Sequence, residues 1–176
     1  MALLHAYLNF NGNCEEAFDF YKTVFNTPLM GVHRFGDMPA DPEHPIAEAD
    51  KDKIMHTALN INDSVMLMGS DCLESFGQKA TFGTGSYLML DAQSATEATE
   101  LYDKLSAGAQ TMEMPLGEQF FAELFASFQD KFGIAWMIHF EGNKKWEHKE
   151  SLQTIQLNIY GLLLYFLQIH RLWGMD

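Results

Sequence analysis

The sequence predicts an α+β fold in which two copies of a βαβββ unit are joined in one chain of 176 residues. Two observations support this prediction. A strand-like segment followed by an amphipathic helix occurs twice, and equivalent helix residues such as Tyr21 and Tyr102 are 81 positions apart. A constant spacing of this kind is typical of a duplicated supersecondary unit. In both halves, further strand-like segments follow the helix and complete the repeated unit.

The first unit begins with a strand over residues 5–10, in which polar and apolar side chains alternate. Turn-forming residues follow this strand. Asn13 and Glu16 then have the spacing of a capping box, which predicts the start of a helix. We expect this helix to end at Asn26, because asparagine tolerates the left-handed backbone conformation.

The second unit repeats this arrangement from residue 87 onward. Residues 87–90 are strand-like, and Ser94 with Glu97 predicts a second capping box. The helix that follows has an apolar face and ends before Gly108.

The strands and loops that complete both units are less sharply defined. After the helices, strands are predicted at residues 54–61, 64–68, 120–128 and 134–140. The polar, proline-containing segment 36–53 is predicted to be a loop or lid, and residues 70–84 a linker. We therefore expect one domain over residues 1–141, with module one at about 1–69 and module two at about 85–141.

Composition excludes several functional classes. The formal net charge is -13, which argues against nucleic acid and against an anionic membrane surface as partners. Cys14 and Cys72 match no zinc or redox spacing, and a reduced pair is expected. The first ten residues lack the basic and long apolar regions of a secretory signal, so we expect a cytoplasmic protein.

Four sequence blocks carry a resemblance to a known family. They lie at residues 7–21, 54–59, 119–125 and 130–136, and their order and spacing are more specific than any single block. Over residues 5–141 the chain resembles the PhnB-like family, described as demethylubiquinone methyltransferase-like, within the vicinal oxygen chelate superfamily of glyoxalases and bleomycin resistance proteins. The resemblance implies a small-molecule pocket between the modules and a homodimer. No glycine-rich strand-to-helix turn of a methyltransferase is present.

The resemblance also implies where a divalent metal would be held, and only part of that ligand set is present. His5 matches the first ligand position. The second falls near Ser86 and the last on Met137, which are poor ligands for a hard cation. We therefore predict no cofactor. The alternative is a rearranged metal site made from His5 with His56, His139 or a glutamate, either Glu118 or Glu123.

The predicted ligand pocket combines polar and pliable apolar side chains from both modules. Its members are His5, Tyr7, Asn9, His56, Met66, Met68, Phe121, Met137 and His139. Ala122 and Ala126 replace glycines that are frequent in relatives, which predicts a narrower space near that strand. Trp136, Ile138 and Phe140 are expected in the core, and Cys14 as a buried, inert thiol.

Two functional hypotheses follow from these residues. One is a binding protein that holds a small molecule between the modules without an intact metal site. The other is a metal-dependent glyoxalase-like lyase or isomerase, or a dioxygenase-type enzyme, that uses the rearranged histidines. The catalytic residues and the ligand are not predicted.

Residues 142–176 do not follow the family pattern. A charged connector is followed by residues 151–169, which contain no Asp, Glu, Lys or Arg. Several Gln and Asn side chains in this stretch disfavour membrane insertion. We expect an apolar helix that docks on the domain or on a partner subunit. The alternative is that a shifted or non-native reading frame produced this segment.

Overall fold

The computed structural model describes residues 2–144 and confirms the α+β fold with two βαβββ modules. Module one contains β1 (Ala6–Phe10), α1 (Cys14–Val24), β2 (Leu29–Arg34), β3 (Ile54–Asn60) and β4 (Met66–Asp71). Module two contains β5 (Leu88–Asp91), α2 (Ala95–Leu105), β6 (Thr111–Gly117), β7 (Leu124–Gln129) and β8 (Ala135–Phe140). The predicted C-terminal helix lies outside the described residues.

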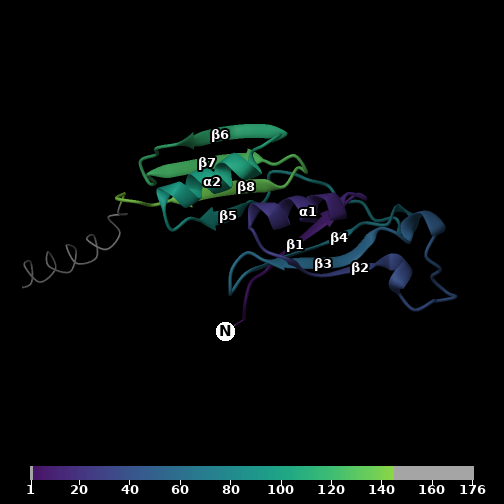
Figure 1. The fold of residues 1–176 in the computed structure, drawn as a ribbon. Helices are drawn as coiled ribbons and strands as arrows, with labels where there is room; N and C mark the ends of the chain where they lie inside the picture. The colour runs from purple at the N-terminus through teal and green to yellow at the C-terminus, as the bar shows by residue number, and fades with distance from the viewer. Residues whose placement is uncertain (1, 145–176) are drawn as a thin grey trace, which may run out of the picture.

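Each module forms a four-stranded mixed sheet with the same strand order. The orders are β1-β4-β3-β2 and β5-β8-β7-β6, and the first strand of each module runs parallel to the last. The two sheets lie beside one another, with β1 and β5 toward the middle of the molecule (Figure 1). The sequence missed β2 and β6, because Gly31 and Pro115 interrupt their strand patterns.

The start of α1 differs from the capping box predicted at Asn13. The Asn13 side chain makes no capping hydrogen bond. Instead, Asp71 at the end of β4 accepts hydrogen bonds from the backbone N–H groups of Gly12 (2.9 Å) and Cys14 (3.0 Å). Its other oxygen accepts from the N–H of Ile54 (2.9 Å). A distant strand therefore supplies the cap that a local sequence pattern could not reveal.

The other local predictions are confirmed except at residues 120–123. Ser94 caps α2 by accepting from the N–H of Glu97 (3.1 Å), although the Glu97 carboxylate accepts from Gln93 rather than from Ser94 itself. Asn26 has the expected positive φ of 49°. Trp136 and Ile138 are fully buried, and Phe140 packs against the core. Residues 120–123, predicted as strand, form a turn before β7, closed by the Gln119 N–H and the Ala122 carbonyl.

Helix α1 joins the two modules. Its Tyr21 hydroxyl donates to Asp130 of the β7–β8 turn (2.6 Å), and the Tyr21 and Trp136 rings are 5.8 Å apart. Asp130 is fully buried and also accepts from the Trp136 indole N–H (2.8 Å). Because buried carboxylates need several donors, this cluster fixes one module against the other.

Residues 35–53 connect β2 to β3, and the segment 36–53 is the predicted lid. It contains two short 3₁₀ helices, η1 (Phe35–Asp37) and η2 (Glu48–Asp50), and a third, η3 (Glu74–Phe76), follows β4. The Gly36 N–H donates to the Lys51 carbonyl (2.8 Å), which closes the base of the loop. A Cβ at position 36 would lie 3.1 Å from that carbonyl oxygen, so glycine permits this approach.

No helix within residues 2–144 has the length and apolar character needed to cross a membrane.

Candidate functional site

The sheet of module one buries one face under α1 and leaves the other open. Strand register places five predicted residues on the open face: Tyr7, Asn9, His56, Met66 and Met68. Two residues that the sequence did not single out, His33 and Ser70, lie on the same face. Alternation along a strand explains why the predicted set shares a face.

Polar side chains on this open face form a row across all four strands. Ser70 donates to the Asn9 amide oxygen (3.2 Å), and His56 is the register partner of His33. The His33 and His56 ring centroids are 6.5 Å apart, and the Tyr7 hydroxyl lies 3.3 Å from His56 Nδ1. We call Asn9, Ser70, His56 and His33 the polar row. These groups can hydrogen-bond an oxygen-rich ligand.

The equivalent face of module two contains Met137 and His139. The third residues of β4 and β8 are Met68 and Met137, and they pair with Tyr7 and Met89, respectively. His139 Nδ1 contacts the Asp91 carboxylate, and the Phe121 ring lies 6.4 Å from the imidazole in a nearly parallel orientation. This histidine is therefore positioned by a carboxylate on the neighbouring strand.

The structure corrects the position that matches His5 in the second module. Because Met68 and Met137 are equivalent, Tyr7 corresponds to Met89, and His5 corresponds to Tyr87 rather than to Ser86. The register-equivalent strand residues Tyr7 and Met89 are 82 positions apart, whereas the first helix residues Cys14 and Ala95 are 81 apart. The Tyr87 hydroxyl donates to Glu113 (2.8 Å), and this contact raises the pKa of the tyrosine.

The candidate metal ligands are engaged with separate partners. His5 Nδ1 accepts from the Met66 N–H (3.1 Å), whereas His56 lies beside Tyr7 and His139 beside Asp91. Within residues 2–144, no group of three or more His, Cys, Asp or Glu side chains is arranged to hold a metal ion. The structure therefore does not bring His5, His56 and His139 together as a ligand set.

The two candidate glutamates also have other contacts. Glu118 forms an ion pair with Lys144 (2.5 Å), which lowers the pKa of its carboxyl group. Glu123 accepts from the N–H of Asn143 (3.2 Å). The residues at the family positions, His5, Tyr87 and Met137, do not fit a divalent metal that needs several nitrogen or oxygen ligands.

Ala122 and Ala126 affect the core rather than the open face. Both side chains are fully buried, and Ala126 pairs with Ile138 on the face that packs under α2. At Ala126, any narrowing of the space near this strand therefore falls on the buried side of the sheet and not on the open face.

A cavity of about 350 Å³ lies between the modules. Its walls come from β1, from residues 79–88 and from the turn before β8, and they include Tyr7, Asn9 and Ser86. Of the nine predicted pocket residues, all of which lie in the described part of the chain, two line these walls, namely Tyr7 and Asn9. We call this 350 Å³ space the inter-module cavity.

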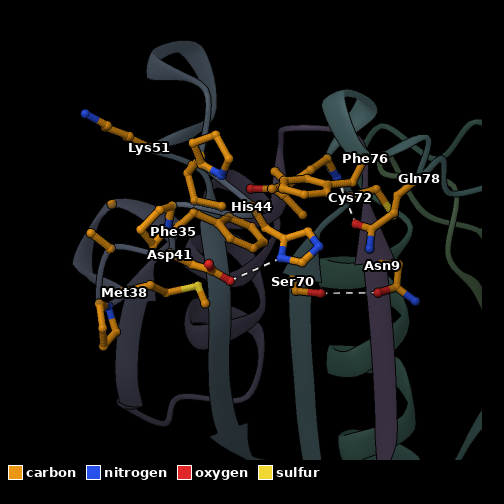
Figure 2. Close-up of a pocket in the computed structure, with 18 of the residues that line it drawn as sticks. Asn9, Phe35, Met38, Asp41, His44, Lys51, Ser70, Cys72, Phe76 and Gln78 are labelled. Carbon is orange, nitrogen blue, oxygen red and sulfur yellow. Dashed lines mark hydrogen bonds and ion pairs between the residues drawn. The ribbon is translucent and has the colours of Figure 1, made fainter.

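A larger cavity of about 1020 Å³ lies between the lid and the ends of β1 and β4 (Figure 2). Sequence reasoning missed most of its walls, although the prolines of segment 36–53 had marked a lid. The walls include Asn9, Phe35, His44, Ser70, Cys72 and Phe76. We call this 1020 Å³ space the lid cavity. Asn9, Cys72 and Lys79 line both cavities, so the two spaces adjoin at these residues.

Ionisable groups at the lid cavity are mostly engaged. Asp71 lines the cavity, but its oxygens accept from three backbone N–H groups. Asp41 accepts from the Glu43 N–H (2.9 Å) and lies 3.1 Å from His44 Nδ1, and these contacts lower the pKa of its carboxyl group. Lys51 pairs with Glu48 and points away from the cavity (Figure 2).

The two cysteines have different environments. Cys14 is fully buried, and desolvation raises the pKa of its thiol, so the expectation of an inert thiol is supported. Cys72 is free, partly exposed and lines both cavities. It can therefore report on the occupancy of either space.

Comparison with known proteins places the chain in a family. Residues 3–139 match the family described as 3-demethylubiquinone-9 3-methyltransferase. Protein YjdN of Escherichia coli is 31% identical over 139 residues, which cover 77% of this chain and 93% of YjdN.

Solved structures agree with this assignment. Protein PA1353 from Pseudomonas aeruginosa is 37% identical, with a TM-score of 0.70 over 80% of this chain and 98% of that one. A PhnB protein from Bacillus cereus, described as a 3-demethylubiquinone-9 3-methyltransferase, is 22% identical, with a TM-score of 0.62 over 78% of this chain and 98% of that one. Glyoxalase/bleomycin resistance proteins of 20% identity or less share the fold. The chain therefore belongs to the PhnB-like family, described as 3-demethylubiquinone-9 3-methyltransferase, and it has the fold of glyoxalase/bleomycin resistance proteins.

Proposed function

We propose that this protein binds a small organic molecule between its modules and that it does so without a resident divalent metal. The observation that carries the proposal is the junction of the two cavities at Asn9, Cys72 and Lys79, where the polar row ends. A concave site with apolar walls and a few convergent polar groups is typical of small-molecule binding. Each of the three candidate histidines, His5, His56 and His139, contacts a different partner, and this supports ligand binding without a metal ion.

The pocket that we propose contains the predicted residues of the open faces together with the cavity walls. Tyr7, Asn9 and His56 provide hydrogen-bonding groups, and Met66 and Met68 provide apolar surface on the same face. On module two we assign Phe121, Met137 and His139 to the corresponding surface, and His5 to the edge of the first. Methionine suits such a surface because its flexible side chain adapts to different ligands.

We also propose a cytoplasmic homodimer. Large apolar side chains are exposed on both sheets, including Met30 and Val32 of β2 and Met89 of β5. Exposed apolar surface of this kind favours association with another subunit. The two free cysteines are consistent with a reducing compartment. Size-exclusion chromatography with light scattering tests the dimer, and the monomer mass of 20.0 kDa at micromolar concentration would contradict it.

The binding proposal is tested on the full chain, purified without added metal and incubated with a small-molecule extract of cells. Native mass spectrometry is expected to show a retained ligand, and occupancy is expected to slow the reaction of Cys72 with iodoacetamide. Cys14 is the matched internal control, because its burial keeps it unreactive in both samples. Asn9→Ala is expected to reduce the protection of Cys72.

Metal analysis separates this proposal from the metal-dependent enzyme. The purified protein is expected to contain under about 0.1 divalent ion per chain, because an incomplete ligand set binds weakly. A stoichiometric metal that is lost in His5→Ala would overturn the proposal in favour of the enzyme. No retained ligand and no protection of Cys72 would contradict small-molecule binding altogether.

A further inference from the structure

Three aromatic rings line the lid cavity, two from the connection between β2 and β3 and one from the segment after β4. Phe35 follows β2, His44 lies in the lid and Phe76 ends η3. Figure 2 shows all three rings directed toward the same space. Phe76 remains 43% exposed, although it is a large apolar side chain. All three residues line one cavity of about 1020 Å³, which is large enough to accept a further aromatic ring against them.

Hydrogen bonds fix the backbone at Phe35 and beside Phe76, on two sides of the cavity. The Phe35 N–H donates to the Lys53 carbonyl (3.1 Å), beside the contact between Gly36 and Lys51. On the opposite wall, the Ser75 hydroxyl donates to Asp50 of η2 (2.6 Å), which fixes the residue next to Phe76. Walls that are ordered before a ligand arrives reduce the entropic cost of binding.

Hydrogen bonds also fix the residues that follow Phe76 along the chain in the same wall of the lid cavity. The Leu73 N–H donates to the Gln78 side chain (3.1 Å), and Asn11 forms two hydrogen bonds with the backbone of Ala80. These contacts hold residues 78–80 across the end of β1. Lys79 therefore lies at a fixed stretch of backbone between the two cavities.

The polar groups at the end of the cavity favour a ligand with a negative charge. Asn9 accepts from Ser70 through its amide oxygen, which leaves its N–H groups to donate to a ligand. Lys79 forms no ion pair with any residue of the described chain, in contrast to Lys51 and Lys53. Asp71 is buried, and three backbone N–H groups already take up most of the acceptor capacity of its carboxylate.

We propose that the lid cavity binds an aromatic carboxylic acid, with its ring among Phe35, His44 and Phe76 and its carboxylate toward Asn9 and Lys79. This proposal deepens the proposed function, on which it depends, by naming the class of ligand. A cavity of about 1020 Å³ admits two fused rings, and its size lies at the upper end of the range for small-molecule sites.

The test uses 2-naphthoate as the probe and the full chain in isothermal titration calorimetry at about pH 7.5, where the carboxylate is ionised. A dissociation constant on the order of 0.1 mM is expected for a ligand of this size. Cyclohexanecarboxylate has the same charge without a planar ring, and 2-naphthalenemethanol has the ring without the charge. Each is expected to bind at least about fivefold more weakly, because it lacks one of the two interactions.

Variants separate the two parts of the site. Phe35→Leu and Phe76→Leu are each expected to lower the affinity for 2-naphthoate by about three- to tenfold. The affinity for cyclohexanecarboxylate is expected to change less, because it has no aromatic ring. Lys79→Gln is expected to remove the preference for 2-naphthoate over 2-naphthalenemethanol. Phe120→Leu is the matched control, since Phe120 is 87% exposed and lines neither cavity. Circular dichroism verifies that every variant is folded.

The outcomes distinguish this inference from the proposed function. Equal binding of the planar and non-planar acids, or insensitivity to the Phe35 and Phe76 variants, would overturn the aromatic-acid site. If 2-naphthoate fails to bind while a cell extract still protects Cys72, the inference is wrong and small-molecule binding stands. If neither protects Cys72, both proposals are wrong.

Discussion

Modules one and two share one strand order, but they use the equivalent connection between strands in different ways. In module one, residues 35–53 join β2 to β3 and form the wall of the lid cavity. In module two, the much shorter segment 118–123 joins β6 to β7 and places Phe121 beside His139. Loop length rather than sheet geometry therefore determines which module provides a large cavity.

The same comparison holds for the polar pairs at equivalent register positions. Asn9 and Ser70 form a neutral pair across β1 and β4, whereas Asp91 and His139 form an ionisable pair across β5 and β8. A duplicated scaffold thus presents the same geometry with different chemistry. Substitutions can test how far the two modules are independent, and those at the contact between the modules are expected to affect stability most.

Asp130→Ala is expected to cause the largest loss of stability, because it breaks the contact between the modules. The fully buried carboxylate accepts from Tyr21, Trp136 and the N–H groups of Phe132 and Ile134. Its removal leaves these donors unpaired and is expected to lower the free energy of unfolding by roughly 3–5 kcal/mol in urea denaturation. Tyr21→Phe removes only the link from module one and is expected to cost about 1–2 kcal/mol. If Asp130→Ala and Tyr21→Phe lowered the free energy of unfolding equally, the Tyr21 hydroxyl would account for the whole effect of Asp130, and this prediction would be wrong.

Gly69→Ala tests a packing difference between the modules. A Cβ at position 69 would lie 2.4 Å from the Phe18 ring, whereas module two has Ile138 at the equivalent strand position. Phe18 is fully buried and cannot move freely, so we expect a loss of about 1–3 kcal/mol by urea denaturation.

Phe18→Leu provides the matched partner for this substitution. The double variant is expected to be more stable than the sum of the single effects predicts, because leucine leaves room for the new Cβ. Additive effects would mean that Phe18 does not require glycine at position 69.

Shortening the lid would make module one resemble module two. The Gly36 and Lys51 backbones are hydrogen-bonded, so a Gly-Ser-Gly linker can replace residues 38–49 without moving the strands. The fold is expected to persist by circular dichroism, while affinity for 2-naphthoate falls at least about tenfold, equivalent to about 1.4 kcal/mol. Unchanged affinity would place the ligand elsewhere.

Asp50→Asn is expected to have the smallest effect, and that effect should depend on pH. Hydrogen bonds from Lys53 and Ser75 lower the pKa of the Asp50 carboxyl group in the folded protein. The stabilisation from this carboxylate is therefore complete above its ordinary pKa of about 4 and is lost as the pH falls through the lower folded value. The Tm of the wild type is expected to exceed that of the variant at about pH 7, and the difference is expected to shrink below about pH 4. A constant difference would contradict this assignment.

Several features could be predicted because they depend on short stretches of sequence. Alternation placed Tyr7 and Asn9 opposite Leu8 and Phe10, and the structure confirms this. The repeat of α1 and α2 and the Ser94 cap were also predictable, because periodicity and capping operate within a few residues.

Other features could not be predicted because they depend on residues distant in sequence. Asp71 caps α1 from the end of β4, and Asp130 joins its own turn to Tyr21 on α1. The equivalence of His5 with Tyr87 became visible only through strand register, since equivalent strand residues are 82 positions apart whereas the helices repeat after 81.

The sequence by itself determined the duplicated strand–helix units with all their later strands except β2 and β6, the family and the faces of the predicted strands, since each is encoded by local periodicity or by ordered motifs. Only the tertiary structure decided which polar side chains meet and where the cavities lie. Phe35 and His44 belong to the connection between β2 and β3, whereas Phe76 belongs to η3, and no pattern in the chain links the two segments. Their proximity arises because hydrogen bonds close the lid at its base and join Asp50 to Ser75, and these contacts form only when the strands have paired.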